Sequence, residues 1–130
     1  MLPASVPHQS TWGGNFTDFV RSTHYLRIIE KERLVDNARV QGEHLLVELI
    51  AVARKHSILQ AVRGRGLMLA FDLPTPALRD AFWKGAYELG LLAVRSGERT
   101  IRLRPMLDVQ ADTIRQAVAL IEKECRKLES

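Results

Sequence analysis

Two short strings in this sequence contain residues that could bind an anion. The first is residues 10–15, which read STWGGN and combine hydroxyl groups with two adjacent glycines. Glycines let the backbone approach a ligand closely, and the hydroxyl of Thr11 can donate a hydrogen bond to a phosphate oxygen. A helix beginning at Asn15 would add the positive end of its dipole. A glycine turn followed by a helix cap explains the same letters, so both interpretations stay open.

The second string is residues 100–105, which read TIRLRP. Alternation along a strand places Arg102 and Arg104 on one face and Ile101 and Leu103 on the other. A guanidinium group held on a strand can bind a carboxylate through two parallel hydrogen bonds. The alternative is a pair of arginines on the solvated face of an edge strand, and the pattern alone does not decide between them.

A third string only imitates a nucleotide-binding loop. Gly64 and Gly66 flank Arg65, but Leu69 occupies the third glycine position and the string precedes a strand. A dinucleotide loop requires three glycines between a strand and a helix. The string therefore predicts a tight turn, with Arg63 and Arg65 as surface or ion-pair residues.

No residue pattern indicates a metal site or a catalytic centre. The four histidines lack metal-ligand spacing, and Cys125 lies on an apolar helical stripe, which favours a core position. The five lysines lie on the polar faces or at the ends of predicted helices, whereas Schiff-base chemistry needs a desolvated lysine. We therefore expect no catalytic residue and no metal ligand in this chain.

The composition indicates a globular protein. Apolar residues make up 46% and charged residues 26% of the 130 residues. No apolar run approaches the roughly 20 residues of a membrane span, and no secretory signal is visible. The single cysteine suits a reducing compartment, so the sequence predicts a cytoplasmic protein without a membrane span.

Hydrophobic periodicity predicts the elements that carry these strings. Apolar residues three and four apart predict helices over 16–31, 34–55, 76–89 and 110–128, with Asn15 and Thr75 as N-caps. Short apolar or alternating runs predict strands over 58–62, 67–73, 91–95 and 100–104, with 67–73 fully buried.

This order predicts an α+β fold, in which a small antiparallel or mixed sheet of three to four strands is covered on one face by helices and preceded by a long helix. It also predicts an extended segment with the STWGGN loop over 1–15, a connecting helix over 16–32 and a small domain over 33–130.

Taken together, three strings resemble a known family. In order and spacing, STWGGN at 10–15, RGRGLM at 63–68 and IRLRPML at 101–107 resemble the C-terminal part of the class III, pyridoxal-phosphate-dependent aminotransferases. Many relatives carry tyrosine at the position of Trp12. The tryptophan makes this chain most similar to the lysine ε-aminotransferase branch. The similarity covers roughly residues 10–128 and implies the small C-terminal domain of such an enzyme.

The resemblance implies roles for three residues. Thr11, with Ser10 beside it, corresponds to the residue that binds the phosphate of pyridoxal phosphate across the dimer interface. Arg102 corresponds to the arginine that binds the substrate α-carboxylate. The implied reaction moves an amino group from lysine or another ω-amino donor to a 2-oxo acid. Met106 departs from the family, which has a second proline after Pro105.

The family's Schiff-base lysine, and the aspartate that pairs with the pyridine nitrogen, lie upstream of all three strings. The resemblance therefore implies that this chain is inactive alone and binds no pyridoxal phosphate alone. It also implies a partner, the cofactor-binding large domain, which this chain lacks. A truncated reading frame, a split gene or a cloned fragment would each give this chain. The apolar stripe of the helix over 16–31 then predicts a homodimer or self-association through those residues.

A second function stays open on the residues alone. The net charge is +4, and seven arginines lie between residues 63 and 104, as in a stand-alone basic α+β module that binds nucleic acid or another protein. Aromatic residues make up only 6% of the chain, which argues against a surface that stacks bases. Nucleic acid is therefore not the expected partner.

Overall fold

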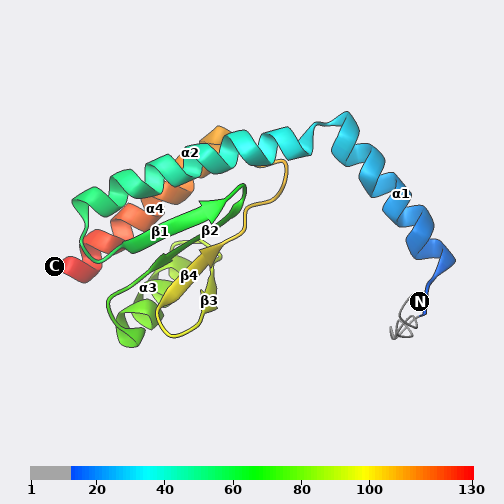
Figure 1. Cartoon of the computed structure of the whole chain (residues 1–130). Helices are drawn as coiled ribbons and strands as arrows, with labels where there is room; N and C mark the ends of the chain where they lie inside the picture. The colour runs from blue at the N-terminus through cyan, green and yellow to red at the C-terminus, as the bar shows by residue number, and fades with distance from the viewer. Residues whose placement is uncertain (1–12) are drawn as a thin grey trace, which may run out of the picture. The chain divides into compact units, whose positions relative to one another are not determined.

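In the computed structural model, residues 13–130 are described, and they form four helices and four strands (Figure 1). The helices are α1 (Phe16–Lys31), α2 (Leu34–Lys55), α3 (Pro76–Glu88) and α4 (Ala111–Glu129). The strands are β1 (Gln60–Arg65), β2 (Met68–Asp72), β3 (Val94–Ser96) and β4 (Thr100–Leu103). The chain divides into two compact units, and the second, Leu34–Ser130, contains the whole sheet.

The sheet is antiparallel throughout, with the strand order β1-β2-β4-β3. Helices α2, α3 and α4 lie on one of its faces, and α2 and α4 run side by side (Figure 1). Side chains of the sheet and the three helices form one core on that face, and Phe71 of β2 meets Phe82 of α3 edge to face at 5.4 Å. The predicted α+β fold, with helices on one face of a small sheet, is confirmed.

The structure corrects the expectation that the strand over 67–73 is fully buried. Along β2, Leu69 and Phe71 are buried, whereas Met68 is 63% exposed and Ala70 is half-buried. A strand is buried on both sides only when both faces of its sheet are covered, and within Leu34–Ser130 helices cover only one face of this sheet. The second face stays open and carries the polar side chains of the sheet.

The first strand and the first turn also differ from the prediction. Ile58 and Leu59 are buried, but they precede β1, which begins at Gln60 and contains a bulge before Arg63. The strand continues through Gly64 to Arg65, which pairs with Met68, so residues 66–67 alone make the turn. Two adjacent apolar residues at 58–59 look like part of a buried strand in the sequence. In the structure they lie in the turn before β1 and pack against the core from there.

The helix ends agree with the sequence. The side chain of Asn15 accepts a hydrogen bond from the backbone N–H of Thr17 at 2.9 Å, and Thr75 accepts one from Leu78 at 3.2 Å. These bonds satisfy amide groups that a helix N-terminus leaves without a partner. At the end of α3, Gly90 has φ = 89°, a left-handed conformation that suits glycine.

The end of α4 is attached to the end of α2 through Glu129. One carboxylate oxygen lies 2.6 Å from Nδ1 of His56, and the other accepts a hydrogen bond from the backbone N–H of Ile58 at 3.1 Å. These hydrogen bonds lower the pKa of the Glu129 carboxyl below its usual 4.5, although partial burial opposes the shift. Ionised Glu129 therefore holds the two helix ends together.

We expect Glu129→Gln to lower the stability of the chain at pH 7. Because the pKa is lower in the folded state, the carboxylate stabilises the fold above about pH 4.5, and this contribution is lost as the pH falls through the folded pKa. The urea midpoint of the variant should therefore be lower at pH 7 and approach that of the wild type in acid. Glu98→Gln, in the turn between β3 and β4, is the control. Equal midpoints at pH 7 would contradict the prediction.

Candidate functional site

Arg102 lies in the middle of the open face of the sheet. Its strand, β4, is hydrogen-bonded to β2 on one side and to β3 on the other. Ile101 and Leu103 point into the core, whereas Arg102 and Arg104 are exposed, as the alternation predicts. The alternative interpretation is right that both arginines lie on a solvated face but wrong about the edge, because β4 is an interior strand. An interior strand is hydrogen-bonded on both sides and is the more rigid support for a binding side chain.

A row of residues crosses the open face at Arg102. The strand register places Arg63 opposite Ala70, Ala70 opposite Arg102, and Arg102 opposite Val94. The small side chain of Ala70 separates the two arginines, and a hollow of about 220 Å³ lies here, lined by Arg63, Gly64, Met68, Leu69, Ala70, Arg102, Leu103 and Arg104. The hollow is therefore cationic at its rim and apolar at its base.

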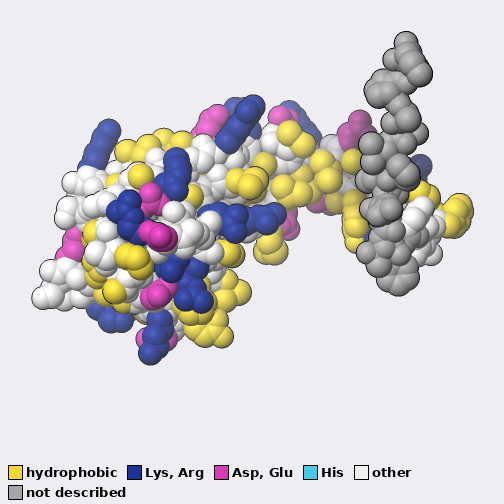
Figure 2. Space-filling model, turned by 60° about the horizontal axis from the view of Figure 1, so that its bottom comes forward, with side chains coloured by type: hydrophobic (Ala, Val, Ile, Leu, Met, Phe, Trp, Pro, Cys, Tyr) yellow, Lys and Arg dark blue, Asp and Glu magenta, His cyan; other side chains and the backbone are white. Residues whose placement is uncertain are grey.

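Most arginines around the sheet already have partners. Arg63 pairs with Asp72 at 3.0 Å, and Arg95 pairs with Asp80 at 3.2 Å while lying over the ring of Trp83. Arg99 donates to the carbonyl of Pro74 at 3.3 Å. On the face shown in Figure 2, basic and acidic side chains are intermixed and do not form a continuous basic surface. The prediction that Arg63 is an ion-pair residue is confirmed.

Arg102 and Arg104 differ from these neighbours. Within residues 13–130, neither guanidinium group forms a hydrogen bond or an ion pair. A guanidinium group without a partner retains its full capacity to bind a carboxylate in the bidentate geometry. The structure therefore brings an available cation to the position that the sequence singled out.

Asp72 is the acidic residue of this face, and sequence reasoning missed it. Its Oδ1 accepts hydrogen bonds from Thr100 at 2.6 Å and from Arg63 at 3.0 Å. Burial opposes its ionisation, but the hydrogen bonds from Thr100 and Arg63 and the charges of Arg63 and Arg99 outweigh it and lower the pKa of the carboxyl. An acidic residue at the end of an apolar strand gives no periodic signal that could have revealed these partners.

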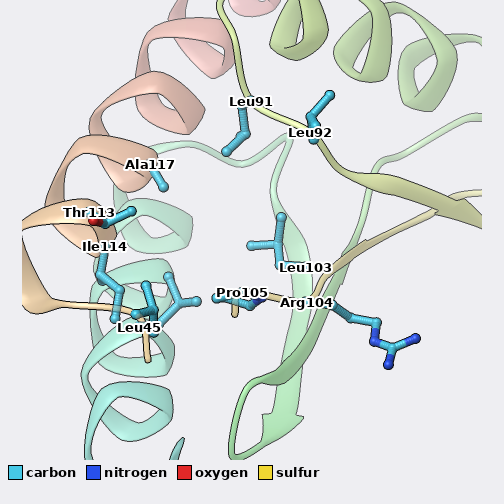
Figure 3. Close-up of a pocket in the computed structure, with 10 residues that line it drawn as sticks. Leu45, Leu91, Leu92, Leu103, Arg104, Pro105, Thr113, Ile114 and Ala117 are labelled. Carbon is cyan, nitrogen blue, oxygen red and sulfur yellow. The ribbon is translucent and has the colours of Figure 1, made fainter. Parts of the chain in front are cut away.

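A second cavity lies between the helices and one end of the sheet (Figure 3). It measures about 150 Å³, and Leu45, Leu91 and Leu103 point into it, whereas the guanidinium group of Arg104 points away. Its lining is almost entirely apolar, so it offers no group for acid–base or carboxylate chemistry. We therefore assign the candidate site to the open face of the sheet.

The described residues do not by themselves fit a pyridoxal phosphate site. All five lysines are exposed, and none lines the hollow beside Arg102. The predicted phosphate ligands Ser10 and Thr11 lie outside the described residues. Residues 13–130 contain no cluster of three or more histidine, cysteine or acidic residues suited to a metal ion.

We expect no single lysine of this chain to form a specific adduct with pyridoxal phosphate. An exposed lysine lacks the desolvation that makes its amine a good nucleophile near neutral pH. The chain would be mixed with the cofactor, reduced with borohydride and mapped by mass spectrometry. Scattered, substoichiometric labelling is the expected result, and stoichiometric labelling of one lysine would refute it. The urea-unfolded chain is the control, because it reports the intrinsic reactivity of the lysines.

Cys125 is a core residue, as expected from its stripe. It is fully buried, and this burial, together with the negative charges of Glu129, Glu122 and Glu124, raises the pKa of its thiol to about 12. A thiol with that pKa is not a nucleophile at neutral pH. Among the described helices, none is long and apolar enough to cross a membrane.

The structure thus shows an antiparallel α+β domain with an exposed arginine in the middle of the open face of its sheet. Comparison with known proteins identifies the family. The family model described as Aminotransferase class-III matches residues 1–124, and this chain belongs to that family. The family implies pyridoxal phosphate as the cofactor of the complete enzyme.

Curated relatives agree with this assignment. L-lysine-epsilon aminotransferase from Mycobacterium tuberculosis is 39% identical over 113 residues, which cover 86% of this chain and 25% of the relative. Acetylornithine aminotransferase from Gloeobacter violaceus is 37% identical over 116 residues, covering 88% and 29%. The chain thus spans about a quarter of the length of the curated relatives it matches.

Solved structures show the same fold. The structure of lysine aminotransferase from M. tuberculosis superimposes with a TM-score of 0.87 at 35% identity, covering 98% of this chain and 29% of that one. Acetylornithine aminotransferase from Elizabethkingia anophelis gives a TM-score of 0.86 at 28% identity, covering 94% and 33%. The resemblance to the lysine ε-aminotransferase branch is therefore confirmed.

Proposed function

We propose that this chain supplies the substrate-carboxylate-binding part of a pyridoxal-phosphate-dependent aminotransferase, and that Arg102 binds the carboxylate. The observation that carries the proposal is the state of Arg102, which is exposed on an interior strand, beside a hollow, without a partner among residues 13–130. Arg102 would bind and orient the substrate. Correct orientation of the substrate accounts for a large part of the rate enhancement by an enzyme.

The amino donor we propose is lysine or another ω-amino compound, and the acceptor is a 2-oxo acid. The relatives act, by their names, on L-lysine at its ε-amine, on 4-aminobutyrate and on acetylornithine. Each of these compounds carries an amine at the end of an aliphatic chain, at a distance from a carboxylate. A fixed arginine on a rigid sheet suits such donors, because it holds the carboxylate end while the amine reacts elsewhere.

We propose that the cofactor phosphate is bound by residues 10 and 11, which lie outside the described part of the chain. By the family resemblance, we propose that Thr11, with Ser10 beside it, binds the phosphate of pyridoxal phosphate across a dimer interface. A threonine hydroxyl can donate such a hydrogen bond, and Asn15 begins a helix whose N-terminus favours an anion nearby. The single buried thiol also suits the reducing cytoplasm, where we place the protein.

A chimera tests the proposed function. The chain would replace the matching segment of the M. tuberculosis L-lysine-epsilon aminotransferase, and lysine, 4-aminobutyrate and acetylornithine would be compared as donors. We expect transamination of at least one ω-amino donor, abolished or weakened by changes at Arg102. A folded, cofactor-loaded chimera without transaminase activity towards any of the three would refute the proposal.

We also propose that helix α1 is an association surface. No residue of α1 is buried, and its large apolar side chains are exposed, among them Phe16 at 81%, Phe19 at 65% and Leu26 at 66%. Each large apolar side chain left in water forgoes roughly 1.5–3 kcal/mol of burial. In the complete enzyme we assign this face to the large domain, and in the isolated chain to a second copy.

The isolated chain should therefore be at least dimeric at micromolar concentration, and the chain lacking residues 1–31 should be monomeric. Light scattering over a wide concentration range measures both. Phe19→Ser together with Leu26→Ser is a subtler variant, because it removes the apolar side chains and keeps the length. A full-length monomer in which α1 is helical by NMR would contradict the proposal.

The alternative of a nucleic-acid-binding module has no specific observation in its favour. Four of the seven arginines between residues 63 and 104 are engaged by acidic partners or carbonyl groups, and the face shown in Figure 2 mixes both signs of charge. Binding to nucleic acid that weakens steeply with salt would restore this alternative.

A further inference from the structure

Two arginines flank Asp72 in the strand register, although the bulge in β1 adds one residue between Arg63 and the direct partner of Asp72. Asp72 is the only acidic residue in the four strands. Ala70 lies opposite Arg63 in β1 and opposite Arg102 in β4, and Asp72 follows two residues later on the same face. Asp72 is therefore the diagonal neighbour of both arginines, at the spacing of about 7–8 Å that long side chains can bridge. Either arginine could take its carboxylate.

In the structure, Arg63 of β1 forms the ion pair with Asp72. Nη2 of Arg63 lies 3.0 Å from Oδ1 of Asp72, and Nη1 of the same guanidinium group donates to the carbonyl of Ala61 at 2.7 Å. Thr100 donates to the same Oδ1 at 2.6 Å from the other side. The carboxylate is thus held between Arg63 of β1 and Thr100 of β4, and the guanidinium group of Arg102 has no partner among residues 13–130.

We propose that Arg63 is a positioning residue, which neutralises Asp72 and thereby leaves the guanidinium group of Arg102 free for a substrate carboxylate. The inference rests on the proposed function of Arg102. It assigns a role to the first arginine of the string RGRGLM, which otherwise has only a structural interpretation. Without Arg63, the diagonal geometry makes Arg102 the competing partner of Asp72, so the site would bind its own side chain instead of a substrate.

The electrostatics of the face agree with this assignment. Burial disfavours the charged form of Asp72, but the hydrogen bonds from Thr100 and Arg63, with the charge of Arg63, lower the pKa of the carboxyl. Arg99 adds a weaker attraction, and its guanidinium group also donates to the carbonyl of Pro74. Arg63 is therefore the main cation that compensates Asp72.

The test measures Arg102 directly in the 130-residue chain, with acetate as the probe. The side-chain Nε–H signal of Arg102 would be assigned by its loss in Arg102→Lys and followed by NMR during an acetate titration. In Arg63→Gln we expect the apparent dissociation constant for acetate at Arg102 to rise about two- to fivefold, the range set by exposed ion pairs. Arg65→Gln is the matched control: it removes the same charge two residues away, and the side chain of Arg65 has no partner within the described chain. This variant should leave the dissociation constant for acetate unchanged.

Two further variants separate positioning from a general structural effect. Arg63→Lys keeps a cation that can reach Asp72, so it should retain most of the acetate affinity. Arg63→Gln with Asp72→Asn removes the competing carboxylate and should restore the wild-type constant. In Arg63→Gln alone, the Arg102 signal should also follow the protonation of Asp72 as the pH is lowered, whereas in the wild type it should not. If Arg63→Gln does not fold, Thr100→Val, which removes the other donor to Asp72, should give a smaller rise.

Each outcome decides one of the two claims. An unchanged acetate constant in a folded Arg63→Gln, or no restoration on adding Asp72→Asn, overturns the positioning role. The same holds if Arg99 rather than Arg102 takes up Asp72. If Arg102 never responds to acetate, yet its signal follows Asp72 in Arg63→Gln, the positioning role stands and the proposed carboxylate-binding function fails.

Discussion

Arg102→Lys should weaken binding of the amino donor by about 1–3 kcal/mol, the range for a hydrogen bond to a charged group. Lysine keeps the positive charge but loses the planar fork that holds a carboxylate through two hydrogen bonds. Measured in the chimeric or complete enzyme, the loss should appear mainly as a higher KM for the donor, since the contact is made in the ground state and in the transition state.

Arg104→Lys is the matched control for this prediction. Arg104 also lacks a partner within the described residues, but it follows the last residue of β4 and is not paired with a strand on either side. Its replacement should therefore raise KM much less. Equal effects at the two positions would show that the carboxylate is bound by the pair, or by Arg104, and would correct the assignment of Arg102.

Gly42→Ala should destabilise the chain by about 1–3 kcal/mol, as other additions to a tightly packed interior do. A Cβ atom at Gly42 would lie 2.1 Å from the carbonyl oxygen of Gly66, in the turn between β1 and β2. The new Cβ is attached to the backbone of α2 and would meet the backbone of the hairpin, so no side chain can rotate to relieve the contact. The helix and the hairpin would therefore have to separate. The expected sign is opposite to that for a solvent-exposed helix position, where alanine is favoured over glycine by about 1 kcal/mol.

Urea denaturation of the two proteins measures the difference. Glu43→Ala, at the next and exposed position of α2, is the control and should change the midpoint little. An unchanged or higher midpoint for Gly42→Ala would contradict the prediction and would mean that α2 can move away from the hairpin at little cost. Gly42 is a buried residue of α2, and the close contact explains why glycine occupies that position.

The local pattern of the sequence was enough for the helices and for the orientation of the candidate side chain. Periodicity predicted α1 and α2 with the bounds that the structure has, because a helix is stabilised by hydrogen bonds within a few residues. Alternation likewise placed Arg102 and Ile101 on opposite faces of their strand, since successive side chains of any strand point to opposite sides.

Only the tertiary structure decided which strands are neighbours and which charges pair. The placement of β4 between β2 and β3 depends on contacts between segments far apart in the chain, so no local pattern could show that Arg102 is on an interior strand. The same is true of Asp72, which meets Thr100 across 28 residues, and of Glu124, which is 1% exposed because Gly85 leaves room for its carboxylate. Charge pairing follows from strand register and packing, and these are properties of the folded chain as a whole.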